Sequence, residues 1–129
     1  MGDNKPVELL HLSLVRAKFC DLIGQAKSMS NDPSTEFLVG LFTLFDALLD
    51  QPMHSIAEKL PIGEDIKLAI CGDKNELKQF LVLIRASESV YWRRIATISK
   101  QLSIDVKMPH AFYNQSLKWD ITMRQSVSS

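Results

Sequence analysis

The residues best suited to metal chemistry are the three histidines, His11, His54 and His110. A hydrolytic metal centre needs about three convergent His, Asp or Glu ligands and an open position for water. The sequence contains no His-Asp dipeptide and no two histidines spaced four residues apart. Asp50 and His54 have the spacing of one helical turn, but Pro52 interrupts the helix that would align them. We therefore expect a surface polar pair there, with no metal site and no cofactor.

Covalent catalysis would require an activated nucleophile, and Cys20 and Cys71 are the obvious candidates. Neither cysteine has a histidine close to it in the sequence, and the Gly-x-Ser-x-Gly motif is absent. Both cysteines fall within apolar helical patterns, which predicts buried thiols. Their spacing is not that of a metal site, and two thiols without a disulfide suit a reducing compartment. The five glycines are scattered, so no phosphate-binding loop is predicted.

Aromatic and basic residues adjoin at residues 91–94, which read Tyr-Trp-Arg-Arg. This combination could stack on the bases and contact the phosphates of a nucleic acid. On a helix, however, Trp92 continues an apolar stripe with Ile95, while Arg93 and Arg94 fall on the solvated side. Fifteen basic and fifteen acidic residues also cancel, so no long-range field attracts a polyanion. We expect Trp92 in the core, Arg93 at the surface and no nucleic-acid partner.

Asp46 lies within the most apolar segment of the chain, residues 37–53. This segment is too short to cross a membrane, which takes about 20 apolar residues, so it is predicted to be a central core helix. A carboxylate buried there without a partner would cost several kcal/mol, so Asp46 must reach the surface or pair. Arg16 and Lys18 are the expected basic partners. Gly40 is expected to permit close helix contact, since glycine otherwise weakens a helix by about 1 kcal/mol.

Apolar residues recur at helical spacing throughout, and no segment has convincing strand alternation. The sequence therefore predicts an all-α fold, a compact bundle of about six or seven helices in one domain spanning residues 1–129. The first helices are expected over residues 6–26, 34–49, 53–60 and 64–71. A fifth helix follows, capped by Asp73 and Glu76, with a break at residues 87–89, although the apolar stripe can also be followed through to residue 102. The last helix is expected over residues 109–124.

The composition, with 46% apolar and 23% charged residues, is that of a globular domain. The first six residues, Met-Gly-Asp-Asn-Lys-Pro, lack the apolar segment of a secretory signal. We therefore expect a cytoplasmic protein that does not associate with a membrane.

Three segments together resemble the HDOD domain of bacterial signalling proteins that pair it with an EAL domain. They are LVRAKFCDLI at residues 14–23, FLVGLFTLFDALLDQPM at residues 37–53 and LPIGEDIKLAI at residues 60–70. The likeness extends over roughly residues 3–119 and keeps the order and spacing of the blocks. Polar and small residues recur at fixed places within apolar helices, which helix physics alone does not require. Tyr91 and Trp92 depart from the pattern, since relatives often have Gly-Asp-Trp there.

The resemblance implies an HD-like fold, a modified HD-GYP domain without the metal-binding His-Asp signature. It implies a non-catalytic regulatory or protein-interaction module in cyclic-di-GMP signalling, with no catalytic residues to carry over. The partner would be another protein or an EAL domain of the same polypeptide. The alternative is a divergent HD-type metal-dependent phosphohydrolase. No EAL motif occurs in this sequence, so we do not expect it to hydrolyse cyclic di-GMP.

The resemblance also suggests that the chain is the later part of an HDOD domain, because relatives have further helices before the position of Lys5. Apolar surface that those helices normally cover would then be exposed, which predicts a homodimer or exchanged helices. The expected contact elements are exposed parts of the first helix and residues 91–94. The structural or interaction candidates are Arg16, Lys18, Asp46, Trp92 and Arg93.

Overall fold

The chain folds into α-helices in the computed structural model, which describes residues 5–27, 34–71 and 76–128. Eight helices follow one another along these residues, and no strand occurs among them. Their bounds are α1 Lys5–Lys27, α2 Ser34–Phe42, α3 Phe45–Leu49, α4 Met53–Lys59, α5 Glu64–Ile70, α6 Glu76–Glu88, α7 Trp92–Gln101 and α8 Met108–Ser128. The predicted all-α class is confirmed. Within these three ranges, no helix combines the length and apolar character needed to span a bilayer.

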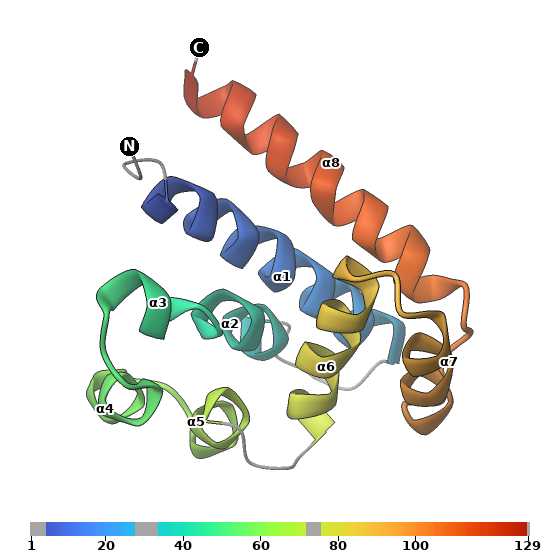
Figure 1. Ribbon diagram of the computed structural model, residues 1–129, viewed down its shortest axis with the longest axis horizontal. Helices are drawn as coiled ribbons and strands as arrows, with labels where there is room; N and C mark the ends of the chain where they lie inside the picture. The colour runs from blue at the N-terminus through green and yellow to red at the C-terminus, as the bar shows by residue number, and fades with distance from the viewer. Residues whose placement is uncertain (1–4, 28–33, 72–75, 129) are drawn as a thin grey trace.

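The central element is α1, with α8 along one side and α2, α3 and α6 packed on others (Figure 1). Val15, Phe19 and Ile23 recur every four residues and form a buried stripe on this helix. α2, α4, α5, α6 and α7 bring buried apolar residues to the same core, and α8 packs Phe112 and Tyr113 against it. The core includes Phe19, Ile23, Val39, Ala57, Ile66, Ala69, Ile70, Phe80, Leu83, Ile84, Ile95, Ile98 and Leu102.

The apolar segment at residues 37–53 is not one helix. α2 ends at Phe42, Thr43 and Leu44 form a turn, and α3 then begins and contains no buried residue. The turn leaves Asp46 exposed, which avoids the cost of burying an unpaired carboxylate. The expectation of a central core helix here is therefore wrong, because only α2 contributes buried residues. The same turn raises the number of helices above the six or seven expected.

α2 lies against the backbone of α1 at Gly40, and the expected close helix contact is confirmed. A Cβ atom added to Gly40 would lie 2.4 Å from the carbonyl oxygen of Arg16 and 2.6 Å from the Cα of Ala17. At Gly24 of α1, an added Cβ would lie 2.7 Å from the Cγ of Glu36 on α2. Both glycines therefore lie at the contact between α1 and α2, Gly40 against the backbone of α1 and Gly24 against the side chain of Glu36.

The starts of α4 and α5 follow local signals. Pro52 precedes α4 in an extended conformation, and Gly63 precedes α5 in the same way. Two acidic residues occupy the first turn of α5, where the helix dipole favours negative charge. The expected cap at Asp73 lies outside the described residues.

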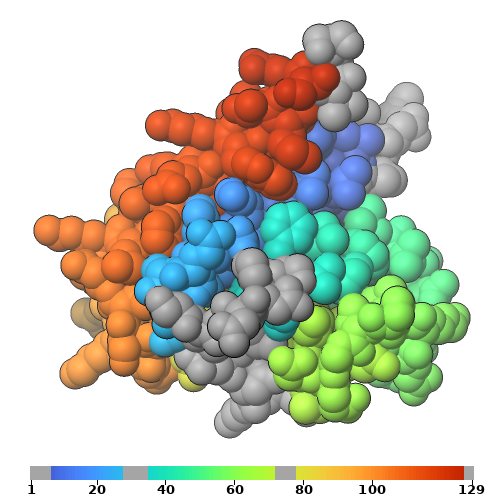
Figure 2. Space-filling model, turned by 180° about the vertical axis from the view of Figure 1, so that it is seen from behind, coloured from blue at the N-terminus to red at the C-terminus, as the bar shows by residue number. Residues whose placement is uncertain are grey.

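α6 and α7 are separate helices, so the break predicted at residues 87–89 is confirmed. α7 packs against α6, and α8 then returns along α1 (Figure 1). From the opposite side, the surface of α1 lies between α8 and α2 (Figure 2). The junction of α6 and α7 thus lies at the end of the bundle where α8 begins.

Candidate functional site

The junction between α6 and α7 is a tight helix end. The N–H of Tyr91 donates to the carbonyl of Ala86 at 2.9 Å, and the N–H of Val90 donates to the carbonyl of Ser87 at 3.2 Å. Val90 itself has a left-handed backbone, with φ 55°. This is the Schellman arrangement, whose left-handed position favours glycine because a β-branched side chain is strained there. The junction fixes the direction in which residues 91–94 leave α6.

We define the aromatic–basic edge as Val90, Tyr91, Trp92 and Arg93. All four side chains are exposed, with 64% of Tyr91 and 61% of Trp92 open to solvent. The expectation that Trp92 lies in the core is wrong, because α7 begins at Trp92 and its buried stripe starts one turn later, at Ile95. Arg93 lies at the surface, as the helical pattern indicates. Large aromatic side chains therefore stand next to a guanidinium group on an accessible surface.

A hollow of about 180 Å³ borders the aromatic–basic edge on the side of α8. The ring of Trp92 lies 6.5 Å from the ring of His110, and the Nε2 of His110 lies 3.2 Å from the Nδ2 of Asn114. Val106, itself exposed, also lines the hollow. This surface therefore combines apolar walls with a small number of polar groups.

Arg16 anchors the end of α6 to α1. Its Nε and Nη2 atoms donate to the two carboxylate oxygens of Glu88 at 2.9 and 2.8 Å. The two side chains are only 10% and 17% exposed, and bidentate pairs of this kind are strong and directional. Burial raises the pKa of the nearby Tyr113, and the charge of Glu88 raises it further. The geometry gives Arg16 a structural partner, which is Glu88 and not Asp46.

Lys18 and Asp46, whose pairing was one of the expected alternatives, have different neighbours. The Nζ of Lys18 lies 3.8 Å from Oδ2 of Asp21 and 5.7 Å from the centroid of the Trp119 ring. The Oδ1 of Asp46 accepts the N–H of Ala47 at 2.9 Å, in the first turn of α3 where a negative charge is favourable. Of the two outcomes expected for Asp46, exposure at the surface is confirmed, whereas pairing with Arg16 or Lys18 does not occur, because the turn after α2 carries Asp46 to the surface. Of the five candidate residues, only Trp92 and Arg93 share one surface.

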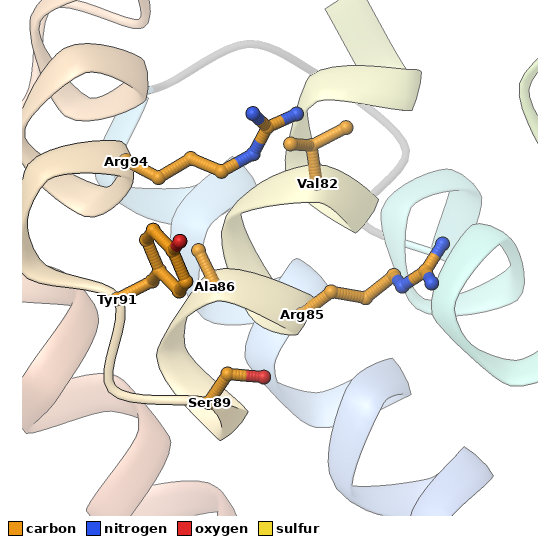
Figure 3. Close-up of a pocket in the computed structure, with 6 residues that line it drawn as sticks. All are labelled: Val82, Arg85, Ala86, Ser89, Tyr91 and Arg94. Carbon is orange, nitrogen blue, oxygen red and sulfur yellow. The ribbon is translucent and has the colours of Figure 1, made fainter.

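The sequence did not reveal a second hollow, of about 310 Å³, between α6 and α7. Figure 3 shows the residues that line it, with Tyr91 and Arg94 on one side and Arg85 on the other. Within the described part of the chain, neither Arg85 nor Arg94 forms an ion pair. The feature of the sequence that could have indicated this hollow is the composition of α7, which carries three basic residues and no acidic one.

The three histidines lie on three helices, α1, α4 and α8. The Nδ1 of His11 lies 3.2 Å from the Oδ1 of Asp120, which is almost completely buried. The other carboxylate oxygen of Asp120 accepts from Arg124 at 2.6 and 2.9 Å. This cluster joins α1 to α8, and sequence spacing could not indicate it because 109 positions separate His11 from Asp120. No group of three potential metal ligands occurs within residues 5–27, 34–71 and 76–128.

The two cysteines have opposite environments. Cys20 is completely buried on α1, and this burial raises the pKa of its thiol far above the usual range. Cys71 is exposed, so the expectation of a buried thiol is correct for Cys20 and wrong for Cys71. Neither forms a disulfide. Since the thiolate is the nucleophilic form, burial makes Cys20 a packing residue.

Two curated proteins are similar to almost the whole chain. An uncharacterized protein of Bacillus subtilis, YuxH, is 30% identical over 118 residues, which is 92% of this chain and 28% of that protein. The cyclic di-GMP phosphodiesterase CdgJ of Vibrio cholerae is 30% identical over 119 residues, again 92% of this chain and 28% of that protein. The chain thus spans just over a quarter of the length of the curated relatives it matches. No family model matches the chain. No solved structure matches it either.

Proposed function

We propose that this chain is a non-catalytic regulatory and protein-interaction module of the HDOD type that acts in cyclic-di-GMP signalling. The similarity to the Vibrio phosphodiesterase, which extends over 92% of the chain, supports the link to this pathway. The HDOD-like segment at residues 14–23 lies in α1, and that at residues 60–70 includes α5. Because the match covers only 28% of the phosphodiesterase, its hydrolytic activity does not follow for this chain.

The observation that carries the interaction role is the exposed aromatic–basic edge. Trp, Tyr and Arg are the side chains that most often dominate the energetics of protein interfaces. Here Tyr91 and Trp92 are more than half exposed, yet the hydrogen-bonded helix end at Val90 holds the backbone beside them. A complementary partner would bury the two rings in an apolar pocket and present a carboxylate to Arg93. The partner that we propose is an EAL domain of the same polypeptide.

The histidines support a regulatory module over the alternative, a divergent HD-type phosphohydrolase. His11 is hydrogen bonded to Asp120, His110 lies near Asn114, and His54 is exposed on α4. A hydrolytic centre would need such groups to converge on one ion with an open water position. Metal analysis separates the two functions, since bound iron or manganese together with phosphodiesterase turnover that His54→Ala abolishes would support the enzyme.

The direct test of the interaction role uses the complete reading frame that contains this sequence. Cyclic di-GMP hydrolysis is measured for the wild-type polypeptide and for a variant carrying Trp92→Ala and Arg93→Ala. We expect the hydrolysis rate to change by about fivefold or more, because losing central interface residues weakens docking by about 1 kcal/mol or more each. Lys100→Ala is the matched control, since it removes an exposed positive charge from the same helix and should leave the rate unchanged.

Two outcomes would contradict this proposal. One is an unchanged rate in the double variant, and the other is a complete polypeptide that hydrolyses no cyclic di-GMP. Circular dichroism of the variants shows whether the fold is retained, which is expected because both substituted side chains are exposed.

We also propose that the chain associates with a second copy of itself through α1 and α8, which pack side by side (Figure 1). Both helices carry exposed apolar side chains, namely Val7, Leu10, Leu117, Ile121 and Met123. Contiguous exposed apolar surface of more than a few hundred Å² favours association. Light scattering should give the mass of a dimer, and Ile121→Glu should shift it toward the monomer. A monomer at high protein concentration would refute the dimer.

A further inference from the structure

We propose that the hollow between α6 and α7 is a binding site for a nucleotide. The phosphate would lie on Arg94, which extends across the hollow, and on Arg85 once its guanidinium, which extends away from Tyr91 in Figure 3, turns toward Arg94. The base would stack on the exposed ring of Tyr91. This ligand site goes beyond the regulatory role and does not depend on it. It shares Tyr91 with the aromatic–basic edge, but Trp92 and Arg93 do not line it.

The charges around this hollow favour an anion. Arg85 comes from α6 and Arg94 from α7, and neither guanidinium is neutralised by an ion pair with a described residue. α7 has no acidic residue, and Glu88 at the end of α6 is already held by Arg16 on the side of α1. The chain as a whole has zero net charge, so this local excess of positive charge is a property of the site. Guanidinium groups match phosphate oxygens in shape and charge, which makes them common phosphate ligands.

The remaining wall of the hollow suits the rest of a nucleotide. Tyr91 offers an aromatic face on which a base can stack, and Val82 and Ala86 supply apolar contact. The hydroxyl of Ser89 can donate to a phosphate or sugar oxygen. The volume of about 310 Å³ is at the lower end of the range for small-molecule pockets, which runs from about 300 to 1,000 Å³. The site is therefore of a size for one nucleotide unit.

Isothermal titration of the intact chain with four compounds tests the site. GMP and cyclic di-GMP carry both a phosphate and a base, whereas guanosine lacks the phosphate and inorganic phosphate lacks the base. We expect saturable binding of at least one of the two nucleotides, with affinities weaker by about tenfold or more for guanosine and for phosphate. Tighter binding of cyclic di-GMP than of GMP would identify a dinucleotide as the preferred ligand of the site. The reverse order would identify a mononucleotide.

Charge-removing variants locate the binding. Arg85→Gln and Arg94→Gln should each raise the dissociation constant of the preferred nucleotide by about tenfold, and Tyr91→Leu by about fivefold. Arg93→Gln is the matched control, because Arg93 is exposed on the same helix and does not line the hollow. It should leave nucleotide affinity unchanged. The same control separates this site from the interaction role, in which Arg93 contacts the partner and Arg85 does not.

Three results would overturn the nucleotide site. The first is the absence of saturable binding of both nucleotides, and the second is inorganic phosphate binding as tightly as either one. The third is equal weakening by Arg93→Gln and Arg94→Gln, which would indicate general attraction of polyanions, as for a nucleic acid. The variants affect exposed side chains, and their circular dichroism spectra should match that of the wild type.

Discussion

Replacing Gly40 with alanine perturbs a close backbone contact between α1 and α2. The added Cβ would lie 2.4 Å from the carbonyl oxygen of Arg16, whereas ordinary contacts of carbon atoms are about 3.5 to 4.0 Å. The obstructing atoms belong to the backbone of α1, so no rotamer change can relieve the clash and the two helices must move apart. Overpacking of this kind costs about 1 to 3 kcal/mol, and looser packing of the buried Phe19 and Val39 adds to that cost. The higher helix propensity of alanine returns about 1 kcal/mol.

We therefore expect Gly40→Ala to lower the free energy of unfolding by about 2 kcal/mol, measured by urea denaturation followed by circular dichroism. Gly24→Ala is the matched control, since it brings the same propensity gain in a helix of the same pair. Its added Cβ would meet the side chain of Glu36, which can move more easily than a backbone. A loss of about 1 kcal/mol or less is expected for the control. Equal effects of the two variants, or a Gly40→Ala variant as stable as the wild type, would refute this packing argument.

Three further predictions concern the elements around the aromatic–basic edge. Arg16→Met should destabilise the fold by about 2 kcal/mol because it leaves the largely buried carboxylate of Glu88 unpaired, and adding Glu88→Leu should recover much of that loss in a thermodynamic cycle. Val90→Gly should raise the free energy of unfolding by about 1 kcal/mol, since φ 55° is unfavourable for valine, and a destabilised variant would contradict the assigned helix end. The fold raises the pKa of Tyr113 above its ordinary value of 10.0, so the stability that the neutral phenol contributes is present below pH 10 and is lost as the pH rises through the raised pKa. In denaturation curves recorded above pH 10, Tyr113→Phe should reduce the decrease in the free energy of unfolding with rising pH. An equally steep decrease in the variant would show that Tyr113 does not cause it.

Local signals in the sequence predicted most of the helices. Pro52 and Gly63 act on their own neighbours, and the serines around Glu88 disfavour a helix interior, so these boundaries follow from short-range chemistry. Gly40 was also informative, since a glycine inside an apolar helix has a cost that close packing offsets. The break after Phe42 had no such marker, because Thr43 and Leu44 are both compatible with a helix.

Long-range partners could not be predicted from the sequence. Arg16 has several acidic residues available to it, and only the fold selects Glu88, 72 positions away. Trp92 fits the apolar stripe of α7 by spacing alone, but at the first residue of the helix the chain has not yet reached the core. The hollow beside Arg94 likewise depends on how α6 and α7 are oriented by their junction. The spacing of apolar residues within one helix therefore predicted which face of that helix is buried. The candidate site, in contrast, depends on which helices lie next to each other in the fold.

The most direct test of the regulatory role is cyclic di-GMP turnover by the purified chain, assayed with magnesium, manganese and ferrous iron. We predict no hydrolysis above the buffer rate with any of the three metals. Metal-dependent hydrolysis that is lost in a folded His54→Ala variant would contradict the non-catalytic role and would identify the chain as a phosphohydrolase.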